Sequence, residues 1–545
     1  MPALFLELFS EEIPARMQSR AADDLARLIT EALAGLTPSN IRTWHGPRRI
    51  AFSAHVKDRL AATATIERGP RVTAPEQALL GFLRKHGVER DQAKQDGDYW
   101  VIEKSTSAVA ADGLIAAALP GVLRRMPWPK SMRWGGTSSF VWVRPLRRIL
   151  CLLDGAILRF DLRDGADDGH GLVSGDLTEG HRFHAPAAFA VSGSTHWVKE
   201  LWDRKVMVDA GEREHAIAIG IGALAAGKNL TVVEDPGLVS EVAGLVEWPV
   251  PLMGRIAEAH MDLPPEVMQV SMRVNQRYFA TRQADGAPAP WFLFVANIEA
   301  DDGGAAIIAG NERVLRARFA DARHFWDLDR KARLESLVPA LDRVTFHARI
   351  GTLGARVARL RRLAAAIAHE TGTGVALAER AAELAKADLV SGMVGEFPEL
   401  QGVMGRYYAL HDHEDAYVAD AIRYHYAPRG PTDPVPTAPV SIAVALADKL
   451  DQLACFFVID ERPTGAGDPY ALRRAALGVI RIIRENGLRL ALLPLLNRAV
   501  TAARKAVQQS VMANETVGAR DTADAAVATA RGFDPLARDI LDFLA

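Results

Sequence analysis

The side chains best suited to chemistry gather in one short stretch of the sequence, ALHDHEDAYVADAIRYHY, residues 409–426. The histidines and carboxylates of this stretch are His411, Asp412, His413, Glu414, Asp415, Asp420 and His425. Imidazole and carboxylate groups are the ligands from which hydrolytic metal centres are built. The first hypothesis is therefore a metal-dependent hydrolase.

The surroundings of this stretch resemble the HD superfamily of metal-dependent phosphohydrolases, in which a histidine, a later His-Asp pair and a further aspartate hold the metal. Asp388 in AAELAKADLVSGMV matches the aspartate of the pair, but Ala387 stands where its histidine belongs. VALADKLDQL keeps the final aspartate as Asp448, whereas Leu353 or a neighbour replaces the first histidine. Even with His425 pointing inward, too few ligands remain for a dedicated metal site. The resemblance implies a degenerate HD-like helical domain that serves as a scaffold and holds no metal.

Asp388 follows an apolar helical stripe by one turn, so we expect it to be buried. A buried carboxylate needs a cation or several hydrogen-bond donors. Its candidate partners are Lys386, Lys449 and His425. The residues from His411 to Asp415 are predicted to begin a helix, where carboxylates suit the helix dipole.

A basic, aromatic tract over residues 123–149 suits a polyanion. It contains no acidic residue, and Trp128, Trp134 and Trp142 are interleaved with its arginines and lysines. A second tract, residues 42–71, is also positive, although the whole chain has a net charge of −2. Clustered arginines with aromatic rings suit phosphate contacts and stacking on unpaired bases. The predicted contact residues are Arg48, Arg49, Arg124, Arg125, Lys130, Arg133, Arg144 and Arg147.

The alternative for this tract is a strand with arginines on its solvated face. We favour that alternative for the tryptophans, which are expected in the core, and leave both readings open for the arginines. A near-match to a phosphate-binding loop, Gly222 to Asn229, lacks the Ser or Thr that binds magnesium. It is interpreted as a helix that ends at Gly227, followed by a strand.

No other catalytic signature is recognisable in the sequence. The adenylate-forming motifs of both synthetase classes are missing, and no Ser-His-Asp or Cys-His arrangement has a recognisable context. The chain is therefore expected to be a subunit or a binding protein with no active site of its own.

The composition is that of a soluble protein with several domains. The chain has 545 residues, of which 49% are hydrophobic and 24% charged, and no run approaches the ~20 apolar residues of a membrane span. Cys151 and Cys455 lie far apart and predict neither a zinc cluster nor a disulfide framework. A cytoplasmic location without membrane contact is expected.

The predicted elements give a multidomain α+β fold. Residues 4–9 predict a buried strand, and residues 10–33 predict a helix capped by Ser10. Strand-rich runs alternate with helices from about 40 to 330, and the pattern is helical from about 334 onward. We expect mixed α/β domains at residues 1–190 and 191–335, a degenerate HD-like helical domain at 336–470 and a helical connector at 471–545.

Ordered sequence blocks resemble the beta subunit of bacterial glycyl-tRNA synthetase along essentially the whole chain. They include LFLELFSEEIPARM, WHGPRRIAF, PKSMRWG, FVWVRPLRRIL, EGHRFHAP, LVEWPVPLMG, LPPEVMQVSMRVNQRYF, MVGEFPELQGVMGRYYA and DPYALRRAALGVIRII. Residues 191–335 are also similar to part of the phenylalanyl-tRNA synthetase beta subunit. The family normally continues into an anticodon-binding domain after DILDFLA, so a truncated sequence is expected.

The resemblance implies a non-catalytic subunit of glycine–tRNA ligase that binds tRNA(Gly). Its partner would be the alpha subunit, in a heterotetramer of two alpha and two beta chains. Alpha would bind ATP and magnesium and make glycyl-adenylate, and the present chain would hold no cofactor. Two alternatives remain at this point: an HD-type metal-dependent nucleotide phosphohydrolase, and an architectural assembly protein whose arginines are merely solvated.

Overall fold

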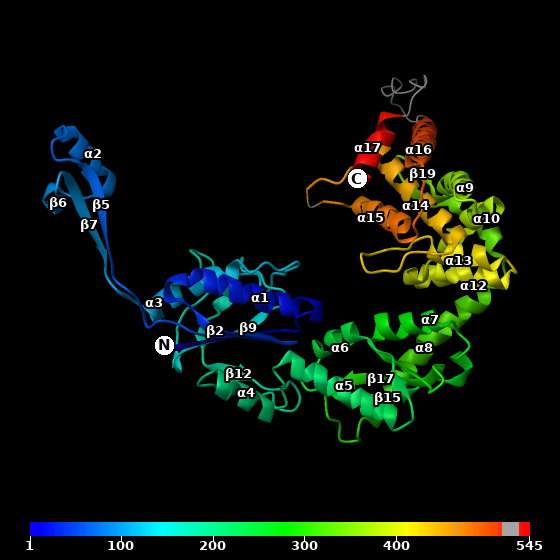
Figure 1. Ribbon diagram of the computed structural model, residues 1–545. Helices are drawn as coiled ribbons and strands as arrows, with labels where there is room; N and C mark the ends of the chain where they lie inside the picture. Colours follow the sequence, from blue (N-terminus) through cyan, green and yellow to red (C-terminus); the bar gives the residue numbers. More distant parts are fainter. Residues whose placement is uncertain (466, 515–533) are drawn as a thin grey trace. The chain divides into compact units, whose positions relative to one another are not determined.

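The computed structural model describes residues 1–465, 467–514 and 534–545. Contacts divide the chain into two compact units (Figure 1). The first unit comprises Met1–Ile256 and Arg277–Glu312, and the second comprises Ala257–Gln276 and Arg313–Ala545. The mixed α/β class predicted from the sequence is confirmed, whereas the four-part domain division stays a prediction.

The main sheet of the first unit has the strand order β10-β9-β1-β3-β2, and the short strand β11 pairs with β9 in parallel. The central strand β1 runs antiparallel to both β3 and β9. The strand bounds are β1 Ala3–Ser10, β2 Ser39–His45, β3 Arg49–His55, β9 Leu146–Leu153, β10 Ala156–Ile157 and β11 Ser174–Gly175. The buried strand predicted at residues 4–9 is confirmed.

Alternate side chains of β1 enter two different cores, because successive residues of a strand point to opposite faces. Leu4, Leu6 and Leu8 pack with α1 (Ala15–Ala32) and α3 (Ala111–Arg124). Phe5 lies on the other face with Trp44 and Trp197. The helix α4 (Ser194–Asp203) covers this face of the sheet (Figure 1). Two helical layers thus enclose the sheet, which leaves Glu7 on the α4 side in a buried position.

The start of α1 differs from the prediction. Ser10 is the last residue of β1, and Pro14 occupies the N-cap position without a side-chain hydrogen bond. Ser10 therefore does not cap the helix, because the strand includes this residue and the helix begins only at Ala15. The predicted apolar face of α1 is buried, with Leu25 and Ile29 fully so.

A second sheet in the first unit has the order β14-β16-β17-β15 and is covered by α5 and α6. Its bounds are β14 Thr231–Val232, β15 Val250–Arg255, β16 Phe279–Arg282, β17 Pro288–Ala296, α5 Ala210–Ala226 and α6 Pro236–Ala243. A three-stranded sheet, β5-β7-β6, carries its own helix α2. The bounds there are β5 Thr63–Arg71, α2 Glu76–His86, β6 Ala93–Asp96 and β7 Tyr99–Thr106. The remaining short pairs are β4 (Arg59–Leu60) with β8 (Val109–Ala110), and β12 (Leu177–Glu179) with β13 (Ala188–Ala190).

The second unit is helical apart from β18 (Thr345–His347) and β19 (Gly351–Thr352), as far as the described residues extend. Its helices include α7 Pro265–Gln269, α9 Leu353–Glu370, α10 Val375–Leu384, α11 Gly392–Glu396, α12 Val403–His411, α13 Ala416–Tyr424, α14 Pro439–Val458, α15 Leu472–Glu485, α16 Leu492–Asn514 and α17 Pro535–Leu544. The helix α8 spans Ala305–Asp329. Almost every residue of α14 is buried, as expected for a helix surrounded by others.

The remaining global expectations concern membranes and cysteines. Within the described ranges no helix combines the length and apolarity needed to cross a bilayer. Cys151 and Cys455 are both buried and free.

Replacing Trp197 with alanine should lower the free energy of unfolding by about 3–5 kcal/mol, because a fully buried indole leaves a cavity beside Phe5 and Trp44. Urea denaturation followed by circular dichroism measures the loss. Trp202→Ala on the same helix is the matched control, since Trp202 is 48% exposed and should cost far less. Equal losses for both variants would contradict this packing.

Candidate functional site

The basic tract of residues 123–149 runs from the end of α3 through a loop into β9. Trp142 belongs to the core, as favoured from the sequence, and Trp128 and Trp134 are partly buried and pack against that core. Trp142 is fully buried and meets the Trp128 ring edge-on at 4.9 Å, and Trp134 stacks on His170 at 4.1 Å. The solvent-exposed cations of the tract are Arg125, Lys130, Arg133, Arg144 and Arg147. The aromatic rings therefore anchor a loop that presents its cations to solvent.

A groove of about 330 Å³ separates this loop from the first half of α1. Arg16 and Arg20 of α1 line one side, and Trp128 and Lys130 line the other. The one carboxylate of the lining, Asp24, also accepts a hydrogen bond from Arg27 at 3.0 Å. Three cations against one shared carboxylate make this groove attractive to an anion.

Arg124 and Arg147 of the tract each lie near a carboxylate of the chain. Arg124 is only 20% exposed, donates to the carbonyl of Leu162 and approaches Asp167 at 3.6 Å, so part of its charge is used within the chain. Arg147 is 62% exposed, and its Nη1 lies 3.6 Å from a carboxylate oxygen of Glu11. Such a long exposed pair contributes little and leaves Arg147 available.

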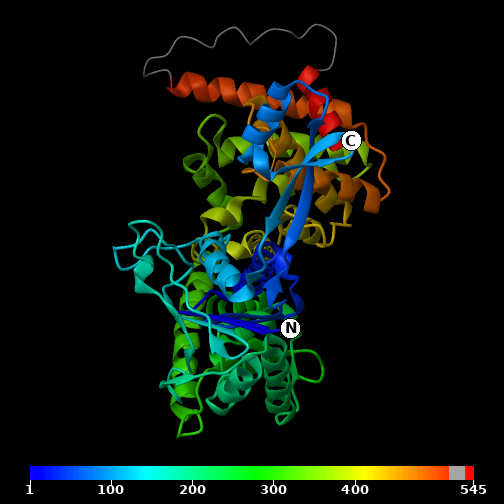
Figure 2. The same ribbon diagram turned by 90° about the vertical axis from the view of Figure 1, so that its left-hand side faces the viewer.

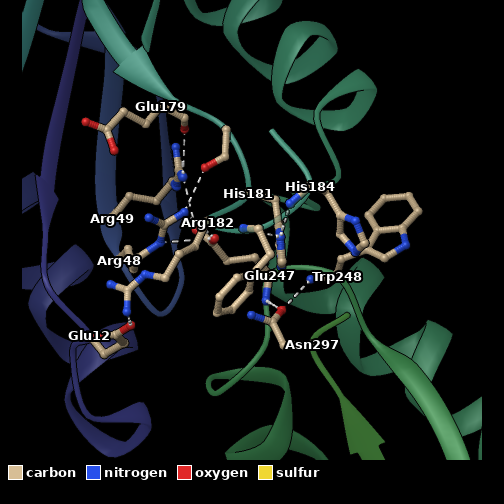
Figure 3. Close-up of polar contacts among 12 residues, drawn as sticks. Glu12, Arg48, Arg49, Glu179, His181, Arg182, His184, Glu247, Trp248 and Asn297 are labelled. Atoms are coloured by element: carbon tan, nitrogen blue, oxygen red, sulfur yellow. Dashed lines mark hydrogen bonds and ion pairs between the residues drawn. The ribbon is translucent and has the colours of Figure 1, made fainter. Parts of the chain in front are cut away.

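Arg48 and Arg49, in contrast, lie in a buried ion cluster (Figure 3). Glu247 accepts from both: Arg48 Nη2 lies 2.7 Å from its Oε2, and Arg49 Nη2 lies 3.0 Å from its Oε1. Arg49 Nη1 also lies 2.9 Å from Oε1 of Glu7. The arginines further donate to the backbone carbonyls of residues 179 and 180. Two buried arginines thus face two buried glutamates, so the cluster is electrically balanced.

The electrostatics of the cluster follow from this pairing. Burial pushes the pKa of Glu247 upward, but the two arginines outweigh it and hold that pKa below its usual value. The ionised cluster ties β1 and β3 to the 179–184 loop and to residue 247. The prediction that Arg48 and Arg49 touch RNA stays untested, and both side chains are already paired with buried glutamates inside the chain.

The loop beside the cluster is a turn organised by His181 (Figure 3). This side chain is fully buried, and its Nδ1 accepts the backbone N–H groups of Phe183 and His184, each at 3.2 Å. Accepting at Nδ1 requires a neutral ring with its proton on Nε2. Burial lowers the pKa of His181, which favours this neutral form.

The turn places polar and aromatic side chains at its rim. Arg182 contacts Glu11 at 2.8 Å and Glu12 at 2.7 Å, and Phe183 is 66% exposed. Asn297, which follows β17, accepts the backbone N–H groups of residues 247 and 248 and fixes that second loop (Figure 3). The sequence blocks WHGPRRIAF, EGHRFHAP and LVEWPVPLMG therefore meet in one place.

Sequence reasoning missed the partners of this cluster, Glu247, His181 and Asn297. One signal was present: Glu7 interrupts the apolar run of a buried strand, and a buried carboxylate requires a cation nearby. The sequence does not identify which of the chain's arginines supplies it.

The predicted HD positions come together in the second unit. Ala387, Asp388 and His425 are fully buried, and Asp448 is nearly so. Asp448 Oδ1 lies 3.0 Å from Lys386 Nζ and 3.0 Å from Arg356 Nη2. Two side-chain cations therefore surround the carboxylate that a metal would use. No group of three or more potential ligands suited to a metal occurs among the described residues.

Asp388 is buried as predicted, but its partners differ from those expected. Its Oδ2 accepts the backbone N–H groups of Gly402 at 2.6 Å and Gly405 at 3.0 Å. Lys386 pairs with Asp448 instead, and Lys449 donates to backbone carbonyls, 2.8 Å from that of residue 427. Burial raises the pKa of Asp388 to about 6 and lowers that of Lys386 to about 8.

His425 and the carboxylates of residues 409–426 have structural roles. His425 Nδ1 lies 2.7 Å from the carbonyl of Ile422, and burial keeps its pKa well below the usual value. Asp415 caps α13, and Asp420 pairs with Arg406 at 2.6 Å. His411 is the last residue of α12, and residues 412–415 join α12 to α13, so the expectation that this segment begins a helix holds only for Asp415, the N-cap of α13.

The near-match to a phosphate-binding loop lies at the end of α5. The helix ends at Ala226 with Gly227 as its C-cap, and β14 follows, as predicted. Gly227 itself has ordinary helical dihedral angles, and Asn229 takes the left-handed conformation. The backbone N–H groups here belong to a helix C-terminus, which does not attract phosphate.

Comparison with known proteins agrees with the sequence blocks. The family described as "Glycyl-tRNA synthetase beta subunit" matches residues 4–532. A "Glycine--tRNA ligase beta subunit" from Phenylobacterium zucineum (strain HLK1) is 52% identical over 504 residues, which cover 90% of this chain and 74% of the relative. One of the same name from Rhodospirillum centenum (strain ATCC 51521 / SW) is 47% identical over 548 residues, 95% of this chain and 76% of the relative.

These matches define the class first: a subunit of an aminoacyl-tRNA synthetase, which is a ligase. More narrowly, the chain belongs to the glycyl-tRNA synthetase beta subunit family. The resemblance found in the sequence is thereby confirmed. The alternative of an HD-type phosphohydrolase is not supported, because the family match includes the helical region and Asp448 there is paired with side-chain cations.

Glu247→Gln should lower the free energy of unfolding by about 3–5 kcal/mol, because it leaves Arg48 and Arg49 buried without their shared anion. Chemical denaturation measures the loss. Glu12→Gln is a matched control, since the Glu12 side chain is 55% exposed and pairs with Arg182 at the surface. A loss of the same size in both variants would show that the buried cluster is not a stabilising contact.

Acidification should destabilise the protein through its buried histidines. The pKa of His181 is lower in the folded chain than in the unfolded chain. As the pH drops below about 6.5, the unfolded state therefore binds a proton at His181 before the folded state does, and the free energy of unfolding decreases. The pKa values of His45, His260 and His425 are lowered as well. His181→Asn keeps an acceptor for the turn but does not titrate, so the stability difference between pH 7.5 and 5.5 should shrink. An unchanged difference would exclude His181 as a contributor.

Proposed function

We propose that this chain acts as the tRNA-binding beta subunit of a glycine–tRNA ligase. It would hold tRNA(Gly) while an alpha subunit joins glycine to it, with conversion of ATP to AMP and diphosphate. Membership of the glycyl-tRNA synthetase beta subunit family supports this role.

The observation that carries the RNA-binding part is the set of exposed cations around the 126–130 groove. Lys130 and Arg133 form no ion pair with any carboxylate of the described residues, and Arg16 and Arg20 extend the positive surface along α1. Unneutralised cations release counterions when they meet phosphates, which provides affinity that falls with salt. Trp142 is buried, and the partly buried rings of Trp128 and Trp134 are engaged with Trp142 and His170, so we propose mainly phosphate contacts at this surface.

The catalytic centre is proposed to lie on the partner. In the described part of this chain, the buried acidic positions of both units are paired with arginine, lysine or backbone N–H groups. ATP and magnesium are accordingly assigned to the alpha subunit, with an assembly of two alpha and two beta chains in the cytoplasm. The helical unit is proposed to be a degenerate HD-like scaffold, since Ala387, Asp388, His425 and Asp448 gather around an internal cation pair.

Charge reversal at the tract tests this role. Arg133→Glu and Arg147→Glu, each in the reconstituted complex with the alpha subunit, should weaken binding of tRNA(Gly) by roughly tenfold. Each should also reduce the slope of log affinity against log salt by about 1 for every phosphate that the variant no longer binds. Both side chains are exposed, so folding should be unaffected. Filter binding across a salt series measures both quantities.

Arg282→Glu serves as the control, because Arg282 is an exposed arginine of the same unit at the end of β16, outside the tract. It should leave affinity and salt slope close to the wild-type values. Wild-type affinity and slope in the Arg133 and Arg147 variants would remove these residues from the RNA surface. If the wild-type complex binds no tRNA in gel-shift measurements, an architectural role is favoured instead.

A further inference from the structure

A second basic groove lies in the helical unit, between α9 and α16, which neighbour each other (Figure 1). It has a volume of about 550 Å³. Its walls are low because alanines of both helices, among them Ala355, Ala358 and Ala502, line it. The long helix α16 is the orange-red helix that lies horizontally near the top of Figure 2.

The charges of this groove are mostly positive. Its lining includes Arg359, Arg362, Arg498 and Lys505 against the single carboxylate of Asp451. Asp451 is already engaged, with Arg359 Nε 2.7 Å from its Oδ1 and Nη2 3.1 Å from its Oδ2. Arg362, Arg498 and Lys505 are exposed, and none of them pairs with a carboxylate of the described ranges. Three uncompensated cations therefore face one groove.

A second observation concerns the floor of the groove. The Arg359 side chain is only 4% exposed, and its Nη1 has no hydrogen-bond partner among the described residues. A buried guanidinium nitrogen without an acceptor is unfavourable. An anion in the groove would provide acceptor oxygens beside this side chain.

The spacing of the cations indicates what kind of anion fits. Arg498 and Lys505 are seven residues apart on α16, which is two helical turns or about 10 Å along the axis. This separation leaves room for more than one phosphate group along the groove. A backbone that carries a phosphate at each step contacts both, together with Arg362 on the opposite wall.

The neutral members of the lining support a phosphodiester backbone. Asn497 and Gln509 carry amide N–H donors on α16, whereas the hydroxyl of Thr501 already donates to the backbone carbonyl of Asn497 at 2.8 Å. The lining contains no aromatic side chain, so it offers neither the rings on which bases stack nor the aromatic anchors typical of protein interfaces. These features suit contacts that position a nucleic acid without reading its sequence.

We propose that the groove between α9 and α16 binds the sugar-phosphate backbone of RNA. This proposal rests on the proposed function, since the RNA would be the tRNA that the subunit holds. It adds a second contact surface, in the helical unit, to the surface on the basic tract of the first unit.

The test uses the complete complex of this chain with its alpha partner and compares two matched pairs of variants. Arg362→Glu is compared with Arg361→Glu on α9, and Lys505→Glu with Arg504→Glu on α16. Arg361 and Arg504 are adjacent in sequence to the groove residues, but their side chains pair with Glu383 and Asp534, outside the groove lining. Each groove variant should weaken tRNA binding by roughly tenfold and lower the salt slope by about 1. The paired controls should change the affinity for tRNA by less than threefold and leave the salt slope at its wild-type value.

A variant without charge change provides an independent readout. Ala358 is exposed and lines the groove, so Ala358→Phe narrows it while all of the cations stay. It should also weaken tRNA binding, and its thermal unfolding midpoint should match the wild type. Wild-type tRNA affinity in Arg362→Glu, Lys505→Glu and Ala358→Phe overturns the groove proposal.

The outcomes separate the two proposals. If the wild-type complex binds tRNA and only the Arg133 and Arg147 variants lose affinity, the groove proposal fails and the proposed function stands. If the wild-type complex binds no tRNA, the proposed function itself fails. Competition distinguishes the ligands: excess AMP or inorganic phosphate should not displace tRNA from the groove, and displacement by poly-glutamate as strongly as by RNA would favour an acidic protein partner.

Discussion

The first unit depends on one buried ion cluster, in which Glu247 holds Arg48 and Arg49 while Glu7 holds Arg49 a second time. Charges in the interior are unfavourable unless each is matched, so β1, β3 and the loops at 179–184 and 247 must be in place together. The cluster holds the backbone of the His181 turn in place, and this turn positions Arg182 and Phe183 at the surface. Charged residues that are far apart in the sequence thus determine the conformation of the exposed 179–184 loop.

Much of the fold could be predicted, because it depends on local patterns. The nearly continuous apolar run of residues 4–9 indicates a strand buried on both faces, and the apolar stripe of α1 repeats every three to four residues. The start of α1 was misplaced because a strand end and a helix cap use the same kinds of residue, and Ser10 suits both. The helix end at Gly227 was predicted from its context, although the left-handed residue proved to be Asn229.

The candidate sites were less predictable, because pairing in three dimensions decides the availability of a charge. Sequence composition treats Arg48, Arg49, Arg124 and Lys130 alike. Burial separates them: the first two have partners in the interior, Arg124 is partly engaged, and Lys130 lines a groove. The groove between α9 and α16 combines residues about 140 positions apart, such as Arg362 and Arg498, which no local pattern connects.

The internal cations around Asp448 have a consequence for metal binding in the helical unit. Replacing Ala387 with histidine would add one nitrogen ligand, but the ammonium of Lys386 and the guanidinium of Arg356 already occupy the surroundings of the carboxylate. A divalent ion would be repelled until both of these side chains had also changed. A divalent-metal site at Asp448 would therefore need changes at Lys386 and Arg356 as well as at Ala387, so a single substitution is not enough.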